Sequence, residues 1–334
     1  MSKIFGKESG RGRGRTFFLL LILSLAIPSV PAAWAAEEPY PNRPINILVG
    51  YAPGGVLDYQ ARLIGDYLAE VLGQPILRVH KPGGGGTLAG SLAAKAKPDG
   101  YTLFVGTSSN IVFSPLVKKV DYTWEDFTPL GIYAKGVVYC FVKADSPYKT
   151  LQDLIDDAKK RPGQLRVSSY GKMTPADFVI QVFSRQAGIQ LAHVPYKSCG
   201  EAVTAVLGGH VETDFCTASM GQMAAGAVRI LASTDSERSK FLPEVRTFTE
   251  LGFPVAIKLW NSFCVPQKTP KKVVDKLTQA MQEVFKRHGK EIQEALIKIE
   301  FLPYFLNFQE SVAEIKRDYE MQSKMVKELG IEVK

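Results

Sequence analysis

A glycine-rich turn with the sequence APGG, residues 52–55, separates an apolar run from a helical pattern that begins at Val56. A turn of this kind leaves backbone N–H groups unpaired at the start of a helix, where the helix dipole attracts an anion. Pro53, Gly54 and Gly55 therefore predict a cradle for a phosphate or a carboxylate. A plain strand-to-helix turn that binds nothing is the alternative that the local pattern leaves open. We expect Gly54→Val to abolish binding, because a side chain would crowd the approach of the backbone to the ligand.

The residues around this turn argue against a nucleotide ligand. A phosphate loop needs GxxxxGK[ST], whereas Gly55 is followed by Val56, Leu57 and Asp58. A second glycine-rich stretch, residues 83–86, also lacks the lysine, and no acidic residue follows about 20 positions later as a dinucleotide-binding motif requires. A carboxylate in the first helical turn would repel a bound anion, so we expect Asp58 to cap the amides of the turn.

Catalytic and metal-binding signatures are weak elsewhere in the chain. Ser219 lies in TASMG, which departs from the GxSxG elbow at its first position, and Cys199 lies near His193 without an identified third group. The sequence contains no HExxH motif and no zinc-ligand spacing. An extracytoplasmic hydrolase is therefore the alternative from another functional class. We predict a protein that is not an enzyme and that uses no metal or cofactor.

The four cysteines leave two readings open. Cys140, Cys199, Cys216 and Cys264 allow three pairings, and none of them belongs to a CxxC motif. The sequence favours free, half-buried thiols. A disulfide is the alternative, because the compartment suggested by the N-terminus is oxidising.

The elements that must position these residues follow an alternating pattern. Apolar, β-branched runs alternate with helical patterns, which is typical of an α/β protein with mainly parallel sheets. The predicted strands span residues 45–50, 76–79, 101–105, 137–142, 165–168, 191–194, 211–216 and 229–232. Apolar residues at helical spacing from Leu57 to Leu72 predict one core-facing stripe. Thr150 and Thr174 are predicted helix N-caps, and Gly188 is a predicted helix end.

The N-terminus has the features of a secretory signal. Residues 1–35 contain a basic opening, an apolar core from Phe17 to Pro28 and the small-x-small sequence Ala33-Trp34-Ala35, which predict export and cleavage before Ala36. The apolar core is far shorter than the roughly 20 residues that a membrane span needs. Removing this leader lowers the formal charge from +8 to about +4, which argues against a nucleic-acid partner. The remaining length predicts two lobes.

Several segments together resemble one family. The opening YPNRPINILVGYAPGGVLDYQARLIGDYLAEVLGQPILRVHKPGGGGTLAG, the segment HVPYKSCGEAVTAVLGGHVETDF and the segment LWNSFCVPQKTP are similar to the Bug family, the periplasmic solute-binding proteins of tripartite tricarboxylate transporters. The resemblance covers nearly the whole chain after the leader. It implies a type II-like periplasmic binding protein with two α/β lobes that close around a small carboxylate. Lobe 1 would comprise residues 36–142 and 265–334, and lobe 2 residues 143–264.

The resemblance also implies which residues line the cleft. On the first lobe they are the turn Pro53-Gly54-Gly55 with Asp58, and Thr107 and Ser108. On the second lobe they are Ser168, Ser169, Thr174, Tyr196, Lys197, Ser198 and Asp214. For three residues a plainer reading stays open: Lys197 as a solvated lysine, Asp214 as the cap of a turn and His193 as a hydrogen-bonded core residue. Asp177 stands where the family commonly has a histidine, so citrate does not follow from the name of the transporter.

The partners follow from the same resemblance. The closed lobes would present the carboxylate to the membrane permease subunits of a tripartite tricarboxylate transporter, and we expect the binding protein itself to be a monomer. A receptor that signals to a sensor kinase is an alternative. Both uses need the same cleft, so the sequence does not separate them.

Overall fold

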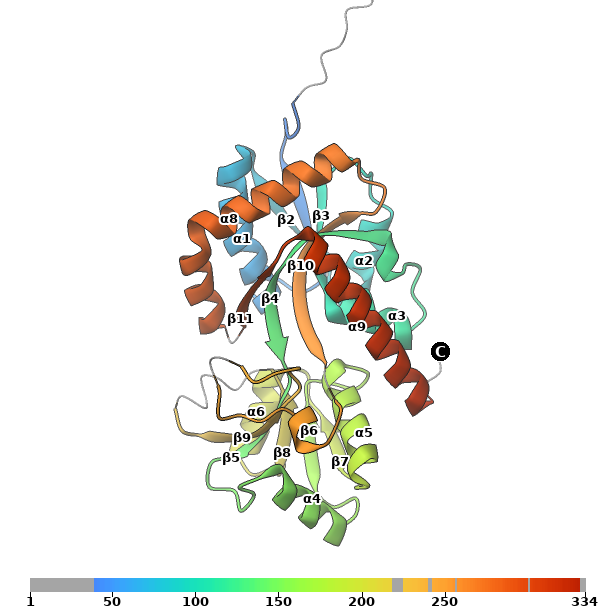
Figure 1. Cartoon of the computed structure of the whole chain (residues 1–334), viewed down its shortest axis with the longest axis vertical. Coiled ribbons are helices and arrows are strands. Elements are labelled where there is room, and N and C mark those ends of the chain that lie inside the picture. The colour runs from blue at the N-terminus through green and yellow to red at the C-terminus, as the bar shows by residue number, and fades with distance from the viewer. Residues whose placement is uncertain (1–38, 218–224, 240–241, 256, 300, 331–334) are drawn as a thin grey trace, which may run out of the picture. The chain divides into compact units, whose positions relative to one another are not determined.

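The computed structural model describes residues 39–217, 225–239, 242–255, 257–299 and 301–330 (Figure 1). The predicted leader, the cleavage site before Ala36 and Ser219 lie outside these ranges. None of the described helices is long and apolar enough to cross a membrane. The described residues form two β-sheets with helices packed against them, which confirms the predicted two-lobed α/β class.

The first lobe is built on a six-stranded sheet in the order β11-β4-β10-β3-β1-β2. Its strands are β1 (Ile45–Val49), β2 (Ile76–His80), β3 (Thr102–Thr107), β4 (Phe127–Val137), β10 (Lys258–Pro266) and β11 (Leu302–Leu306). β1 is parallel to β2 and β3, whereas β10 is antiparallel to β3 and β4, and β11 to β4. The sheet is therefore mixed, with its parallel strands together at one side.

Helices cover both faces of this sheet. They are α1 (Val56–Leu72), α2 (Thr87–Ala94), α3 (Ser114–Val117), α8 (Lys271–Lys298) and α9 (Phe308–Leu329), with shorter helical turns η1 (Ser108–Phe113) and η2 (Trp124–Asp126). The predicted stripe of α1 is confirmed, since Ile64 and Leu68 are fully buried in one cluster with Leu277 and Met281 of α8. α2 and α9 contribute to a second cluster on the sheet. α1 ends at Gly73, whose φ of +66° suits the left-handed C-cap.

The second lobe is built on a five-stranded sheet in the order β7-β6-β8-β5-β9. Its strands are β5 (Tyr139–Lys143), β6 (Arg166–Ser169), β7 (Ala192–Pro195), β8 (Thr213–Cys216) and β9 (Val228–Ser233), and its helices are α4 (Leu151–Lys160), α5 (Pro175–Ala187) and α6 (Cys199–Leu207), with the turn η3 (Thr249–Leu251). β6 is parallel to β7 and β8, and β5 is antiparallel to β8 and β9. The predicted caps are confirmed: Thr150 forms a capping box with Asp153, Thr174 caps α5, and Gly188 ends it with φ +62°.

The chain passes between the two sheets twice. Only Val138 separates β4 of the first sheet from β5 of the second, and the chain returns between β9 and β10. We expected these passages near Val142 and near Cys264. Thr234 joins the two passages, because its N–H donates to the Val138 carbonyl (2.9 Å) and its hydroxyl donates to the Ile257 carbonyl (2.9 Å). The lobes are thus connected by adjacent extended segments that are hydrogen-bonded to each other.

Candidate functional site

The glycine-rich turn after β1 lies at the carboxyl edge of the parallel strands in lobe 1. Pro53, Gly54 and Gly55 are exposed, and Gly54 has φ +80°. The Gly54 N–H donates to Asp58 Oδ2 (2.9 Å), so Asp58 caps the turn as predicted. The first helical hydrogen bond of α1 runs from the Tyr59 N–H to the Gly55 carbonyl (2.9 Å), so the N–H groups of Val56 and Leu57 have no acceptor within the helix. The first turn of α1 therefore offers free N–H donors at this edge.

The carboxylate of Asp58 is itself in contact with two side chains of β2. Its Oδ1 lies 2.8 Å from His80 Nε2 and 3.3 Å from Arg78 Nη1. Burial alone would raise the pKa of Asp58, but the Gly54 amide, His80 and Arg78 outweigh burial and hold that pKa below its usual value. The repulsion that an Asp in this turn exerts on an anion is thereby reduced.

Thr107 and Ser108 lie at the end of β3, on the same edge, and both are buried. The Thr107 hydroxyl accepts from the Asn110 N–H (3.1 Å), and Asn110 Oδ1 accepts from the Thr107 N–H (2.8 Å). Ser108 Oγ accepts from the Trp260 N–H at 3.4 Å. These two residues are thus held by hydrogen bonds within the lobe, at the same sheet edge as the turn.

Two tyrosines that were missed in the sequence lie directly after the strands that carry the predicted loops. Tyr51 precedes the turn and donates to the Gly85 carbonyl (2.9 Å). Burial raises the pKa of Tyr170, which follows β6; the Ala176 amide lowers that pKa, and the charge of an ionised Tyr51 raises it. Tyr51 belongs to lobe 1 and Tyr170 to lobe 2, and the two lobes touch near these loops through Phe113 of η1 and Phe178 of α5, whose ring centroids are 5.4 Å apart. Their positions directly after parallel strands were the available signal.

The structure adds a second physical reason to the Gly54→Val prediction. A Cβ on Gly54 would meet no atom within 4 Å, so the substitution does not crowd the protein. The left-handed conformation is the obstacle, because it costs a residue with a side chain about 1–2 kcal/mol and most for a β-branched one. We expect carboxylate affinity to fall by about tenfold or more in a calorimetric titration, as the turn leaves its conformation. Gly252→Val is the matched control, since Gly252 also has positive φ (+90°) and an open Cβ position; an equal loss of affinity in both variants would contradict the cradle.

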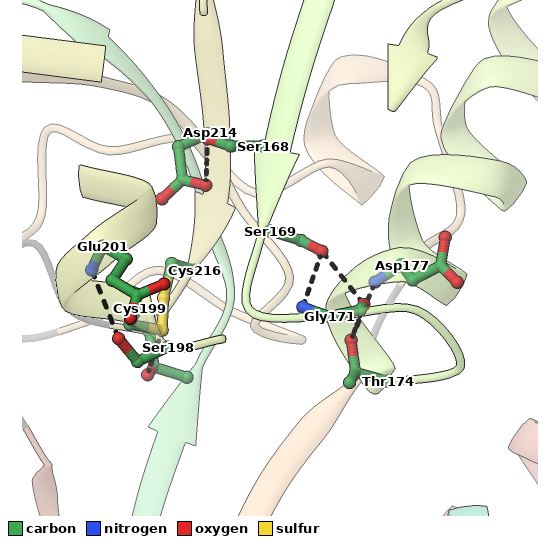
Figure 2. Close-up of a disulfide and its surroundings, with 11 residues drawn as sticks. Ser168, Ser169, Gly171, Thr174, Asp177, Ser198, Cys199, Glu201, Asp214 and Cys216 are labelled. Carbon is green, nitrogen blue, oxygen red and sulfur yellow. Dashed lines mark hydrogen bonds between the residues drawn. A yellow bond between two sulfur atoms is a disulfide. The ribbon is translucent and has the colours of Figure 1, made fainter. Parts of the chain in front are cut away.

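The loop after β6 holds the predicted residues Ser169 and Thr174 close together (Figure 2). Thr174 donates its hydroxyl to the Gly171 carbonyl (2.8 Å), and Ser169 Oγ accepts from the Gly171 N–H (3.2 Å). Ser169 Oγ also lies 2.8 Å from His193 Nε2. Both hydroxyls therefore stabilise their own loop, a role that the sequence did not suggest for them.

Ser168 and Asp214 form a separate pair in the interior of lobe 2, visible in Figure 2. Both are fully buried, and the Ser168 hydroxyl donates to Asp214 Oδ1 (2.6 Å). Asp214 Oδ2 has no partner among the described residues. Burial raises the pKa of Asp214 to about 7, although Ser168 and the Phe215 amide pull it down. Asp214 is thus a carboxyl group that takes up a proton near neutral pH.

The pKa of Asp214 predicts a pH dependence of stability. Its folded pKa of about 7 exceeds the unfolded value of about 3.9, so its contribution is fully present below about pH 4 and is lost as pH rises through about 7. We expect Asp214→Asn to remove this loss, so that the variant gains on the order of 2–4 kcal/mol relative to wild type between pH 4 and pH 8. Urea unfolding at several pH values measures it. Parallel stability profiles for the two proteins would contradict the assignment.

Tyr196, Lys197 and Ser198 follow β7 and lead into α6. Ser198 caps α6 by accepting from the Glu201 N–H (3.3 Å), and the Lys197 N–H donates to Glu201 Oε2 (3.1 Å). The side chain of Lys197 is exposed. Tyr196 and Ser198 line a shallow surface pocket whose other residues are Gly200, Glu201, Thr204, Ala205 and His210.

A disulfide links Cys199, the first residue of α6, to Cys216 at the end of β8 (Figure 2). The reading of all four cysteines as free thiols was therefore wrong for this pair, whereas Cys140 and Cys264 are free and buried. The disulfide leaves Cys199 without the thiol that the hydrolase alternative required. In the described ranges, no group of three acidic, histidine or cysteine side chains could hold a metal ion.

Comparison with known proteins agrees with this architecture. Residues 60–331 match the family model described as the tripartite tricarboxylate transporter family receptor. A Cupriavidus necator protein, described as a UPF0065 protein in the gbd 5' region, is 31% identical over 92% of this chain and 94% of its own length. The protein BugT of Bordetella pertussis is 28% identical over 95% of this chain and 98% of its own length.

Solved structures add ligands to the comparison. MatC of Rhodopseudomonas palustris, solved with bound malate, has a TM-score of 0.71 and 26% identity over 86% of this chain and 100% of its own. Another R. palustris protein, solved with adipate, has a TM-score of 0.74 and 26% identity over 88% of this chain and 100% of its own. With the family match across most of its length, the chain belongs to the receptor family of the tripartite tricarboxylate transporters, the periplasmic solute-binding proteins of the Bug type.

Proposed function

We propose that the protein captures a small carboxylate between its two lobes and delivers it to the membrane permease subunits of a tripartite tricarboxylate transporter. The observation that carries this proposal is the aromatic contact between Phe113 of η1, which follows β3, and Phe178 of α5, which follows β6; their ring centroids are 5.4 Å apart, so the loop edges of the two sheets lie together. The first-turn amides of α1 supply donors for a carboxylate on one side. The malate and adipate bound to the two relatives support a carboxylate as the ligand of this protein, and a dicarboxylate as the first candidate.

The proposed mechanism is closure on the ligand. In the open state the loop amides are hydrated, and the carboxylate replaces this water. Only the closed form satisfies the donors of both lobes at once, so the ligand has higher affinity for it and shifts the population toward it. The residues proposed to line the closed cleft are the turn at Pro53, Gly54 and Gly55, with Thr107, Ser108, Ser169, Thr174 and Lys197 around it.

Two finer features belong to the same proposal. The protein is exported, is cleaved before Ala36 and then acts as a monomer. Mass spectrometry of the secreted protein would test both the cleavage site and the monomeric state. It acts as a binding protein and not as an enzyme, in keeping with its family. A sensor kinase as partner instead of a permease would use the same cleft. Deleting the permease subunits of a tripartite tricarboxylate transporter from the host distinguishes the two, because only the transport role predicts a loss of uptake.

The deciding experiment is thermal unfolding of the purified protein with a panel of acids. Bound ligand is first removed by unfolding and refolding, and malate, adipate, citrate, an aromatic acid and an amino acid are then added. A ligand at about 100 times its Kd adds roughly 2.7 kcal/mol, which gives a clear shift of Tm. A selective shift by one carboxylate supports the proposal. An absence of any shift across the panel contradicts it.

A further inference from the structure

The loop before α1 is held by an aspartate and a histidine. Asp58 is the third residue of α1, and its Oδ2 accepts from the N–H of Gly54, the residue just before the N-cap. Its Oδ1 lies 2.8 Å from Nε2 of His80, the last residue of the neighbouring parallel strand β2. Gly54 has φ +80°. The aspartate thus connects a left-handed residue of the loop to the edge strand of the sheet.

The loop before α5 is held in the same way in the other lobe. Asp177 is the third residue of α5, and its Oδ2 accepts from the N–H of Met173, again the residue just before the N-cap (2.7 Å). Its Oδ1 lies 3.1 Å from Nδ1 of His193 in β7, the neighbouring parallel strand. Met173 has φ +54° and is the only residue other than glycine with positive φ in the described ranges. The helix position, the left-handed residue and a histidine from the neighbouring parallel strand therefore recur in both lobes, although the contacting atom is Nε2 in His80 and Nδ1 in His193.

Two other helices of lobe 2 show which parts of this arrangement are ordinary. Asp153 of α4 accepts from the Lys149 N–H (2.8 Å), and Glu201 of α6 accepts from the Lys197 N–H (3.1 Å). Neither Lys149 nor Lys197 has positive φ, and neither acid has a histidine among its described ion-pair partners. An acidic cap at the third helical position is thus common here, whereas the left-handed residue and the histidine occur at the two loops that follow β1 and β6.

A left-handed residue is costly, above all at Met173, and it persists only where its surroundings hold it. In each lobe the aspartate holds the left-handed residue by accepting a hydrogen bond from its N–H, and the histidine fixes the position of the aspartate side chain. Burial would raise the pKa of Asp177, but His193 and the Met173 amide outweigh it and keep that pKa below its usual value. The carboxylate therefore stays ionised as an acceptor for the Met173 N–H.

We propose that Asp58–His80 and Asp177–His193 are matched positioning pairs, which hold one preorganised ligand loop on each lobe. This inference rests on the proposed carboxylate-binding function. In lobe 2 the pair extends to Ser169, whose Oγ lies 2.8 Å from His193 Nε2. Ser169 contacts His193, and His193 contacts Asp177, as in the catalytic triad of a serine hydrolase. However, Ser169 is fully buried, and its hydroxyl is already hydrogen-bonded to both the N–H and the carbonyl of Gly171. The geometry therefore holds the serine in place and does not present it as a nucleophile.

The test separates positioning from general stability. His80→Ala and His193→Ala remove the histidine partner of each aspartate, while Arg78 still contacts Asp58. His80→Asn and His193→Asn restore a short hydrogen-bonding side chain. Asp153→Ala is the matched control, because it removes the same type of cap from a helix without a histidine. For each variant, Tm, the Kd for malate and for adipate, and the backbone amide resonances of Gly54 and Met173 without ligand are measured.

We expect each alanine variant to shift the amide resonance of its own loop only, to weaken binding by about tenfold or more, and to be partly rescued by asparagine. Asp153→Ala should lower Tm without changing Kd. Unshifted resonances, or losses of affinity that simply follow Tm in all variants including the control, would overturn the inference. If wild type binds neither acid, the proposed function fails for these ligands, and the amide resonances still decide whether the pairs hold the loops.

Discussion

Asp235→Ala is expected to lower the free energy of unfolding by about 3–5 kcal/mol, the cost of leaving one partner of a buried ion pair alone. Both oxygens of Asp235 contact Lys135 Nζ, at 2.7 and 2.8 Å. The two side chains are 3% and 10% exposed. Without Asp235 the ammonium group of Lys135 stays in the interior with no carboxylate to balance it.

The position of this pair adds to its effect. Lys135 belongs to β4 of lobe 1, and Asp235 follows β9 of lobe 2 directly after Thr234, which joins the two passages between the sheets. We therefore expect Asp235→Ala also to loosen the connection between the lobes. Urea unfolding measures the stability loss. Asp121→Ala is the control, because its pair with Lys95 is 50% and 65% exposed and should contribute under about 1 kcal/mol; similar losses in both variants would contradict the role of burial.

Trp260→Ala is expected to cost about 3–5 kcal/mol, as other removals of a large buried aromatic side chain do. Trp260 is 1% exposed and packs in one cluster with Phe104, Ile132 and Ile315 of α9. Its Nε1 also donates to Asp318 Oδ2 (2.9 Å). The variant thus creates a cavity and removes a donor from a buried carboxyl group.

The loss in Trp260→Ala should grow with pH. Burial raises the pKa of Asp318 to about 7, while Gln322 and Trp260 lower it. Without the indole the pKa rises further, so the contribution of protonated Asp318, present below about pH 4, is lost over a wider range as pH rises. Unfolding at pH 5 and pH 8 tests this. Two control variants separate packing from the hydrogen bond. Trp260→Phe keeps most of the side-chain volume, and Trp124→Ala removes a half-buried tryptophan. An equal loss of unfolding free energy in Trp124→Ala would show that packing around Trp260 does not explain the effect.

Local signals in the sequence were sufficient for the elements with local causes. The cap residues Thr150 and Thr174, the stop at Gly188 and the apolar stripe of α1 depend on neighbours within a few positions, and all are confirmed. Strands β4, β10 and β11 were not predicted. Most residues of β4 and β10 are buried on both faces, so the alternation that marks a half-buried strand is absent.

The site shows the same limit. The turn at Gly54 and its cap Asp58 are close in sequence and could be predicted together. The histidines could not, because His80 and His193 reach the aspartates only through the pairing of parallel strands. The pairing of Cys199 with Cys216 likewise depends on where α6 and β8 lie, which spacing alone does not reveal.

The two passages between the sheets also set the order in which the chain can fold as it emerges from its N-terminus. All strands of the second sheet lie between residues 139 and 233, so this sheet can form while β10 and β11 have not yet emerged. Strand β4 is already made by then, but both of its neighbours in the sheet are these later strands. In the N-terminal lobe, β4 therefore stays unpaired until the inserted lobe and β10 have emerged. A chain that ends before Lys258 exposes this unpaired strand edge, which promotes aggregation.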